Sequence, residues 1–233
     1  MTRSISFRFL QPGGVHPAWL MWFLIHRPRL RRAFEYANTR APAELRSLFW
    51  ELSLMRRMSS LAVGMLLREL VARMPPGHAY VNVGIWEGFS LFAGMAGNED
   101  KICIGIDDYS QFDRPREKFL RNFGRVRRSP LHVHRDVDYE TYFATMHEGP
   151  IGVYYYDGEH GYENQRKNLE IVERFLVPGS IVIVDDTDYP EPRRATEDYL
   201  SSRPGMYDRA FDVSVSRPGH PTWWNGLVVL RRR

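Results

Sequence analysis

The acidic residues and the histidine that are best placed to do chemistry come directly after two apolar runs of the sequence. Asp157, Glu159 and His160 follow the first run, and Asp185 and Asp186 follow the second. If the two runs are neighbouring strands, their ends lie roughly 4.8 Å apart, and unneutralised carboxylates there repel one another. Mg²⁺, or another divalent cation such as Ca²⁺ or Mn²⁺, would remove that repulsion through oxygen ligands at about 2.0 to 2.6 Å.

The sequence therefore predicts a metal site formed by Asp157, Asp185 and Asp186, with a ligand type that does not suit structural zinc. The alternative is that one of the paired aspartates caps the next helix and that Asp157 only holds a loop. Glu159 and His160 are the candidate proton acceptors beside the site, although His160 could instead bond to its own turn.

A glycine-containing loop indicates a nucleotide-like ligand. Gly84 and Gly88 follow an apolar run and permit a tight turn, and Asp107 comes about twenty residues later, where a carboxylate can bind ribose hydroxyls. Glu87 argues against a pyrophosphate and suits the ammonium and sulfonium groups of S-adenosylmethionine, unless it simply faces solvent at the helix start. Asp136 is expected at the adenine edge, or else as a turn or N-cap residue.

The elements that must position these residues are strands alternating with helices. Such alternation predicts a Rossmann-like α/β sandwich with a mostly parallel sheet, and a final antiparallel pair is expected at 211–216 and 223–230. Before this core, residues 1–42 read as irregular and 43–73 as one or two helices. We therefore expect an N-terminal segment, 1–76, packed on a core unit, 77–233. The strand runs are 79–83, 101–106, 131–133, 151–156 and 180–184, and a crossover helix is expected at 162–176.

Composition narrows the choice of partners. The net charge of +4 comes mostly from scattered arginines, so no nucleic-acid partner is predicted. The apolar run 18–25 is too short to span a membrane and carries no signal-peptide cleavage pattern. A single cysteine, Cys103, fits a reducing cytoplasm. The aromatic N-terminal segment is expected to pack on the domain or on a second copy of the chain, rather than to lie on a membrane.

Taken together, these motifs resemble the macrocin O-methyltransferase-like family and, more distantly, catechol O-methyltransferase. The resemblance covers about residues 77–190 and is carried by the glycine loop through Ser90, the acid Asp107, the Asp-Gly-x-His motif and the Asp-Asp pair. It implies a class I methyltransferase fold with a seven-stranded sheet, S-adenosylmethionine as donor, and Mg²⁺ beside a hydroxyl acceptor. Asn82 departs from the family pattern, in which an acidic residue commonly precedes the loop.

Carried over to this sequence, the resemblance implies that Asp157, Asp185 and Asp186 bind metal and that Asp107 binds ribose. The expected donor-site residues are Asn82, Gly84, Glu87, Gly88, Ser90, Asp107, Asp136 and Asp157. The expected function is transfer of a methyl group to a sugar or phenolic hydroxyl of a small molecule, with the acceptor walls in segments 189–194 and 217–224. A metal-independent enzyme of the same fold and an inactive donor-binding module are the alternatives.

Overall fold

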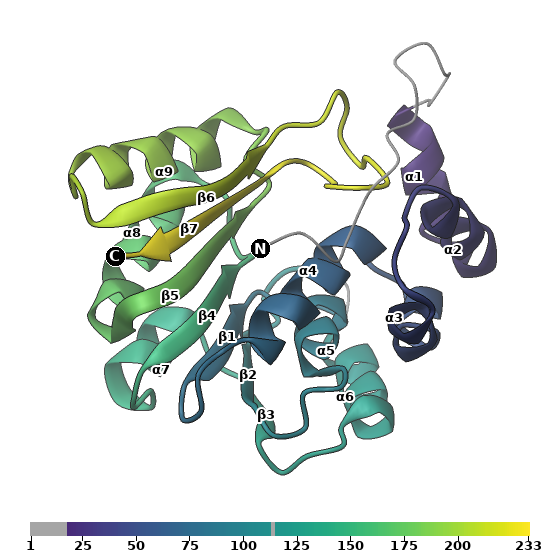
Figure 1. Ribbon diagram of the computed structural model, residues 1–233, viewed down its shortest axis with the longest axis horizontal. Helices are drawn as coiled ribbons and strands as arrows, with labels where there is room; N and C mark the ends of the chain where they lie inside the picture. Colours follow the sequence, from purple (N-terminus) through teal and green to yellow (C-terminus); the bar gives the residue numbers. More distant parts are fainter. Residues whose placement is uncertain (1–17, 113–114) are drawn as a thin grey trace.

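The computed structural model describes residues 18–112 and 115–233, and the irregular stretch predicted for residues 1–17 lies outside this part of the chain. A seven-stranded sheet with the order β3-β2-β1-β4-β5-β7-β6 forms its centre (Figure 1). Strands β1 to β5 pair in parallel, whereas β7 pairs antiparallel with both β5 and β6, so only β7 runs against the other six. The strands are β1 (Ala79–Val83), β2 (Ile102–Ile106), β3 (His132–Arg135), β4 (Ile151–Tyr156), β5 (Leu176–Asp185), β6 (Tyr207–Val213) and β7 (Leu227–Arg232).

Helices cover both faces of the sheet, because the central strands are apolar on both sides. One core layer joins the sheet to α4 (Leu61–Ala72), α5 (Phe89–Met95) and α6 (Pro115–Val126). The opposite layer joins it to α7 (Tyr139–Thr145), α8 (Tyr162–Val172) and α9 (Pro190–Ser201). The predicted Rossmann-like sandwich with an antiparallel C-terminal pair is therefore confirmed. The last strand, expected at 223–230, begins and ends later in the structure, because Trp223 and its neighbours form a loop.

The N-terminal segment is more helical than the sequence suggested. The prediction of irregular structure up to residue 42 is wrong for α1 (Ala18–Leu24) and α2 (Pro28–Ala37). Pro28 stands at the first position of α2, where its missing N–H costs nothing, so it starts a helix instead of breaking one. Two further helical pieces, α3 (Ala43–Leu48) and the 3₁₀ turn η1 (Leu52–Leu54), precede α4.

A buried charged cluster docks α2 onto the loop before α4. Glu35 is fully buried and pairs with Arg57 and with Arg31, whose Nε lies 3.6 Å from the carboxylate. Arg31 also donates to the carbonyl oxygens of Arg57 and Ser59. The cluster thus ties α2 to the loop before α4 within the N-terminal segment. Within residues 18–112 and 115–233, no helix is long and apolar enough to cross a membrane.

The sheet order reverses beside β1, whose neighbours are β2 on one side and β4 on the other. In an open parallel sheet this reversal opens a crevice at the carboxyl ends of the strands, which is where ligands bind. The predicted chemical residues follow β1, β2, β4 and β5 at this edge.

Candidate active site

A cavity of about 580 Å³ lies at the carboxyl ends of the central strands. Its wall includes Gly84 after β1, Asp107 after β2, Asp157 after β4 and Asp186 after β5. The predicted residues Ser90, Glu159 and His160 line it as well. The size lies within the range of small-molecule sites, roughly 300 to 1,000 Å³.

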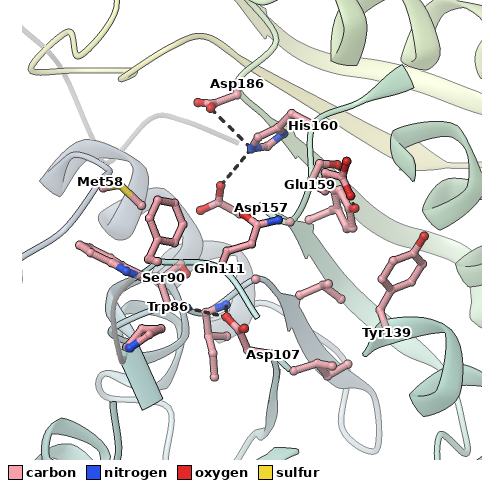
Figure 2. A pocket seen from close by; sticks show the side chains of 18 of the residues that line it. Met58, Trp86, Ser90, Asp107, Gln111, Tyr139, Asp157, Glu159, His160 and Asp186 are labelled. Atoms are coloured by element: carbon pink, nitrogen blue, oxygen red, sulfur yellow. Dashed lines mark hydrogen bonds and ion pairs between the residues drawn. The ribbon is translucent and has the colours of Figure 1, made fainter. Parts of the chain in front are cut away.

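One end of the cavity is formed by the loop after β1. Gly84 has a φ of +77°, and a Cβ at this position would come within 2.0 Å of the Asp157 carbonyl oxygen, so the turn requires glycine. The Asp107 carboxylate accepts hydrogen bonds from the backbone N–H groups of Ile85 (2.9 Å) and Trp86 (2.8 Å) and so holds the loop (Figure 2). Burial raises the pKa of Asp107, while these backbone hydrogen bonds oppose the rise.

Glu87 does not line the cavity, contrary to its predicted place beside the donor's sulfonium. Its side chain is buried, with an Oε1 atom that lies 2.9 Å from the Arg56 guanidinium and 3.4 Å from Lys118 Nζ. Turning this carboxylate toward the ligand would break its contacts with two cationic partners, which is unfavourable for a buried charge. The negative charge of the loop therefore belongs to an internal ion pair.

Three other predicted donor-site residues also lie outside the cavity wall. Asn82 is fully buried and donates to the backbone oxygen of Val83. Gly88 has a φ of +103° and lies against the ring of Phe92, which a Cβ would approach to 2.2 Å, so this glycine serves packing. These two positions are corrected from ligand contact to support of the loop and of α5.

Asp136 is the last of these corrections. Its carboxylate pairs with Arg116, at 2.6 Å, and with His134 Nδ1, at 3.0 Å, on the outer side of the strand end. The next residues along the chain, Val137 and Asp138, line the cavity in its place. Alternation along an extended segment accounts for Val137, which is one residue from Asp136 and therefore faces the other way.

The opposite end of the cavity holds a cluster formed by Asp157, His160 and Asp186. His160 Nε2 lies 3.5 Å from Asp157 Oδ1 and 3.5 Å from Asp186 Oδ2, so the imidazole bridges two strand ends (Figure 2). Burial lowers the pKa of His160, but the hydrogen bond to Asp157 and the charges of both aspartates outweigh it and raise the pKa to about 9. Burial and the charge of Asp157 raise the pKa of Asp186 to about 6.

Asp185 does not join this cluster. It is 1% exposed, accepts a hydrogen bond from the Tyr155 hydroxyl through one oxygen, and accepts the Asp186 backbone N–H through the other. Burial and the charges of Asp157 and Asp186 raise its pKa well above the usual range, which favours a neutral acid. The side chain thus contacts the hydroxyl of Tyr155, a residue of the core layer beneath α4 and α5.

The three aspartates as arranged do not fit the predicted metal site. Among the residues that the structure describes, no group of three or more His, Cys, Asp or Glu side chains could hold a metal ion. Two of the predicted ligands lie 3.5 Å from His160, whose pKa is raised to about 9, and the third accepts a hydrogen bond from a tyrosine. The raised pKa values of His160 and Asp185 both reduce the negative charge at these strand ends without a bound cation.

Several wall residues escaped the sequence analysis because they come from loops and from the N-terminal segment, where no periodic pattern marks them. Tyr189 and Trp224, from the segments 189–194 and 217–224 that are expected to wall the acceptor site, line this cavity. Further lining residues that the sequence analysis did not single out as site residues are Trp22, Arg57, Met58, Ser59, Trp86, Ser110, Gln111, Phe112, Tyr139 and Asn225.

Comparison with known proteins identifies the domain. Residues 81–187 match the model of a family described as a methyltransferase domain. Residues 81–187 thus form a methyltransferase domain. No curated protein matches this methyltransferase in sequence.

Solved structures share the fold of this methyltransferase at low sequence identity. A protein from Corynebacterium glutamicum superposes with a TM-score of 0.58 at 14% identity, covering 88% of this chain and 96% of its own. The O-methyltransferase from Bacillus cereus, in complex with SAH, gives 0.55 at 10% identity, with 91% of each chain covered. TomG, an O-methyltransferase of tomaymycin synthesis from Streptomyces achromogenes in complex with SAM, gives 0.57 at 14% identity, covering 82% and 88%. Such likeness supports the Rossmann-like methyltransferase fold.

Proposed function

We propose that this methyltransferase transfers a methyl group from S-adenosylmethionine to a hydroxyl group of a small molecule. One observation carries the proposal: a single cavity has a loop held by Asp107 at one end and the Asp157–His160–Asp186 cluster at the other (Figure 2). The first end suits a nucleoside and the second suits an acceptor that must lose a proton. The O-methyltransferases among the structural neighbours support the same class of reaction.

The residues of the first end fit the donor. Gly84 lets the ligand approach the backbone closely, since it has no side chain and its turn is fixed against Asp157. The two oxygens of Asp107 have about four acceptor sites, of which the N–H groups of Ile85, Trp86 and Tyr109 take three. One site therefore remains for a ribose hydroxyl. When bound, the donor supplies a methyl group on a sulfonium.

The residues of the second end prepare the acceptor. Displacement at the methyl carbon requires the acceptor oxygen in line and at least partly deprotonated. His160, held as a cation between two carboxylates, is placed to stabilise the negative charge that develops on that oxygen. Asp186 then accepts the proton at its carboxylate, and Glu159, which lines the same cavity, is the second candidate for this role.

A metal-assisted transfer is the second candidate function. It is favoured by the presence of three aspartates at two neighbouring strand ends, but it requires Asp185 to turn away from Tyr155. Turnover measured with and without a chelator separates the two mechanisms. If the His160 cluster acts without a metal, chelation leaves the rate within about twofold, whereas complete loss that Mg²⁺ restores would favour the metal-assisted mechanism.

Calorimetry with S-adenosylmethionine and S-adenosylhomocysteine tests donor binding. Asp107→Asn removes one acceptor oxygen and the charge, so we expect both ligands to bind roughly 10- to 100-fold more weakly, as for loss of a charged hydrogen bond. Asp208→Asn, at the edge strand β6 and remote from the cavity wall, is the matched control and should bind as the parent does. Absence of binding by the parent chain would refute the proposal, and binding without turnover would indicate an inactive donor-binding module.

The acceptor and the assembly remain proposals that follow from the sequence. We expect the methyl acceptor to be a small molecule rather than a nucleic acid. We also expect a cytoplasmic location. A homo-oligomer would form through the N-terminal segment. Gel filtration with light scattering, and a gel shift at varied salt, would test the oligomer and the absence of nucleic-acid binding.

A further inference from the structure

Aromatic side chains from distant parts of the sequence wall the cavity near the Asp157–His160–Asp186 cluster. Trp22 comes from α1, Tyr189 follows β5, and Trp224 lies in the loop before β7, and all three line the cavity. The ring centroids of Trp22 and Trp224 are 5.3 Å apart. Trp22 is 42% and Tyr189 41% exposed, so large ring surfaces remain open to a ligand.

The aromatic wall is fixed to the reactive cluster. Trp224 is buried, and its backbone N–H and carbonyl both bond to the backbone of His220. The next residue, Asn225, donates through Nδ2 to Asp186 Oδ1 at 2.8 Å. On the side of α2, the Arg31 guanidinium lies 5.1 Å from the centroid of the Trp224 ring. A compound seated against this wall is therefore held at a set place relative to the proton acceptor.

Beside Trp224, the nearest hydrogen-bonding side chain is committed to partners within the protein. The Asn225 amide donates to Asp186 and accepts from the Gly219 N–H at 2.7 Å. Ser59 Oγ, in a residue that is 4% exposed, lines the cavity and has no partner within the described part of the chain. A sugar, with a hydroxyl on most of its carbons, would leave several of them without partners, whereas a flat ring with one or two hydroxyls would not.

We propose that the acceptor is a planar hydroxylated aromatic compound, whose ring lies against Trp22 and whose reacting hydroxyl meets His160 and Asp186. This inference rests on the proposed function and adds the class of acceptor to it. The N-terminal helices then form part of the active site, because α1 supplies a wall of the acceptor end.

Equilibrium binding in the presence of S-adenosylhomocysteine tests the acceptor class, with 3,4-dihydroxybenzoate and methyl glucoside as probes. We expect the phenol to bind at least tenfold more tightly than the sugar. Trp22→Ala should weaken phenol binding by about 3- to 10-fold, the range for one aromatic contact, and Trp22→Phe should restore it to within about twofold. Trp50→Ala is the matched control, since Trp50 is 54% exposed, lies in the same N-terminal segment and does not line this cavity.

The possible outcomes separate the two proposals. If S-adenosylhomocysteine binds but the phenol does not, or if the sugar binds more tightly, the acceptor inference is overturned and the proposed function stands. Equal effects of Trp22→Ala and Trp50→Ala on phenol binding would also overturn it. If S-adenosylhomocysteine itself fails to bind, the proposed function fails, and the acceptor inference fails with it.

Discussion

Replacing Glu35 by glutamine should destabilise the methyltransferase severely. Glu35 is fully buried between Arg57, at 0% exposure, and Arg31, at 1%. Its Oε1 atom also accepts the backbone N–H of Leu61 at 3.3 Å, at the start of α4. Glutamine has the same shape and removes the negative charge, so two guanidinium groups would remain buried without it.

The size of the effect follows from the burial of all three groups. Breaking a buried ion pair by removing one partner costs about 3 to 5 kcal/mol, because the remaining charge is desolvated and uncompensated. Burial already lowers the pKa of Arg31 to about 9, which shows that its charge is held at a cost even beside Glu35. For a chain of this length, Tm falls by about 2 to 4 °C for each kcal/mol of stability lost. The expected fall in Tm is therefore roughly 6 to 20 °C.

Urea unfolding, monitored by circular dichroism, measures the loss in the free energy of unfolding. The dependence of this free energy on urea concentration should match that of the parent chain. Glu44→Gln is the matched control, since Glu44 is exposed in the first turn of α3, and it should change stability by no more than about 0.5 kcal/mol. A loss below about 1 kcal/mol for Glu35→Gln would refute the reasoning. A new early transition, with an unchanged main one, would instead show that α1 and α2 detach on their own.

Three further variants test local features. Gly84→Ala forces a Cβ to within 2.0 Å of the Asp157 carbonyl at a left-handed φ, so it should lower Tm and abolish S-adenosylhomocysteine binding; normal binding by calorimetry would contradict this. Tyr155→Phe leaves the buried Asp185 without its hydroxyl partner and should cost about 1 to 3 kcal/mol in urea unfolding. Burial lowers the pKa of His147, so the unfolded chain binds its proton more tightly, and stability should fall as pH drops below about 6.5; His147→Phe should reduce that fall between pH 7.5 and 5.5.

The strand ends could be predicted because they follow from local pattern and a general property of parallel sheets. Short apolar runs gave five strands, and their carboxyl ends had to meet at one edge of the sheet, so Gly84, Asp107 and Asp157 were placed correctly at the cavity. Glu87 and Asp136 were not placed correctly. Each pairs with basic residues on other elements, and these arginines and a lysine lie far from them along the sequence.

The acceptor end was harder to predict for a different reason. Trp22 and Trp224 are about 200 residues apart in the sequence, and their rings meet beside α2, where Arg31 of the buried ion-pair cluster lies over Trp224. The sequence shows unexplained aromatic residues in both segments, and that is a sign that something must cover them. It does not show that they cover one another, since loops carry no periodicity from which a partner could be read.

Alternation along β5 explains why the paired aspartates act separately. Ile181 and Ile183 belong to the same core layer as Tyr155, and Asp185 continues their side of the strand. Asp186 leaves the strand with a φ of +56° and lines the cavity with His160. Adjacent residues at a strand end face opposite ways unless the backbone turns, so an Asp-Asp pair does not by itself place two carboxylates on one ligand. The two carboxylates that do lie together, Asp157 and Asp186, both approach His160 and raise its pKa, so a histidine of the chain itself can offset their repulsion.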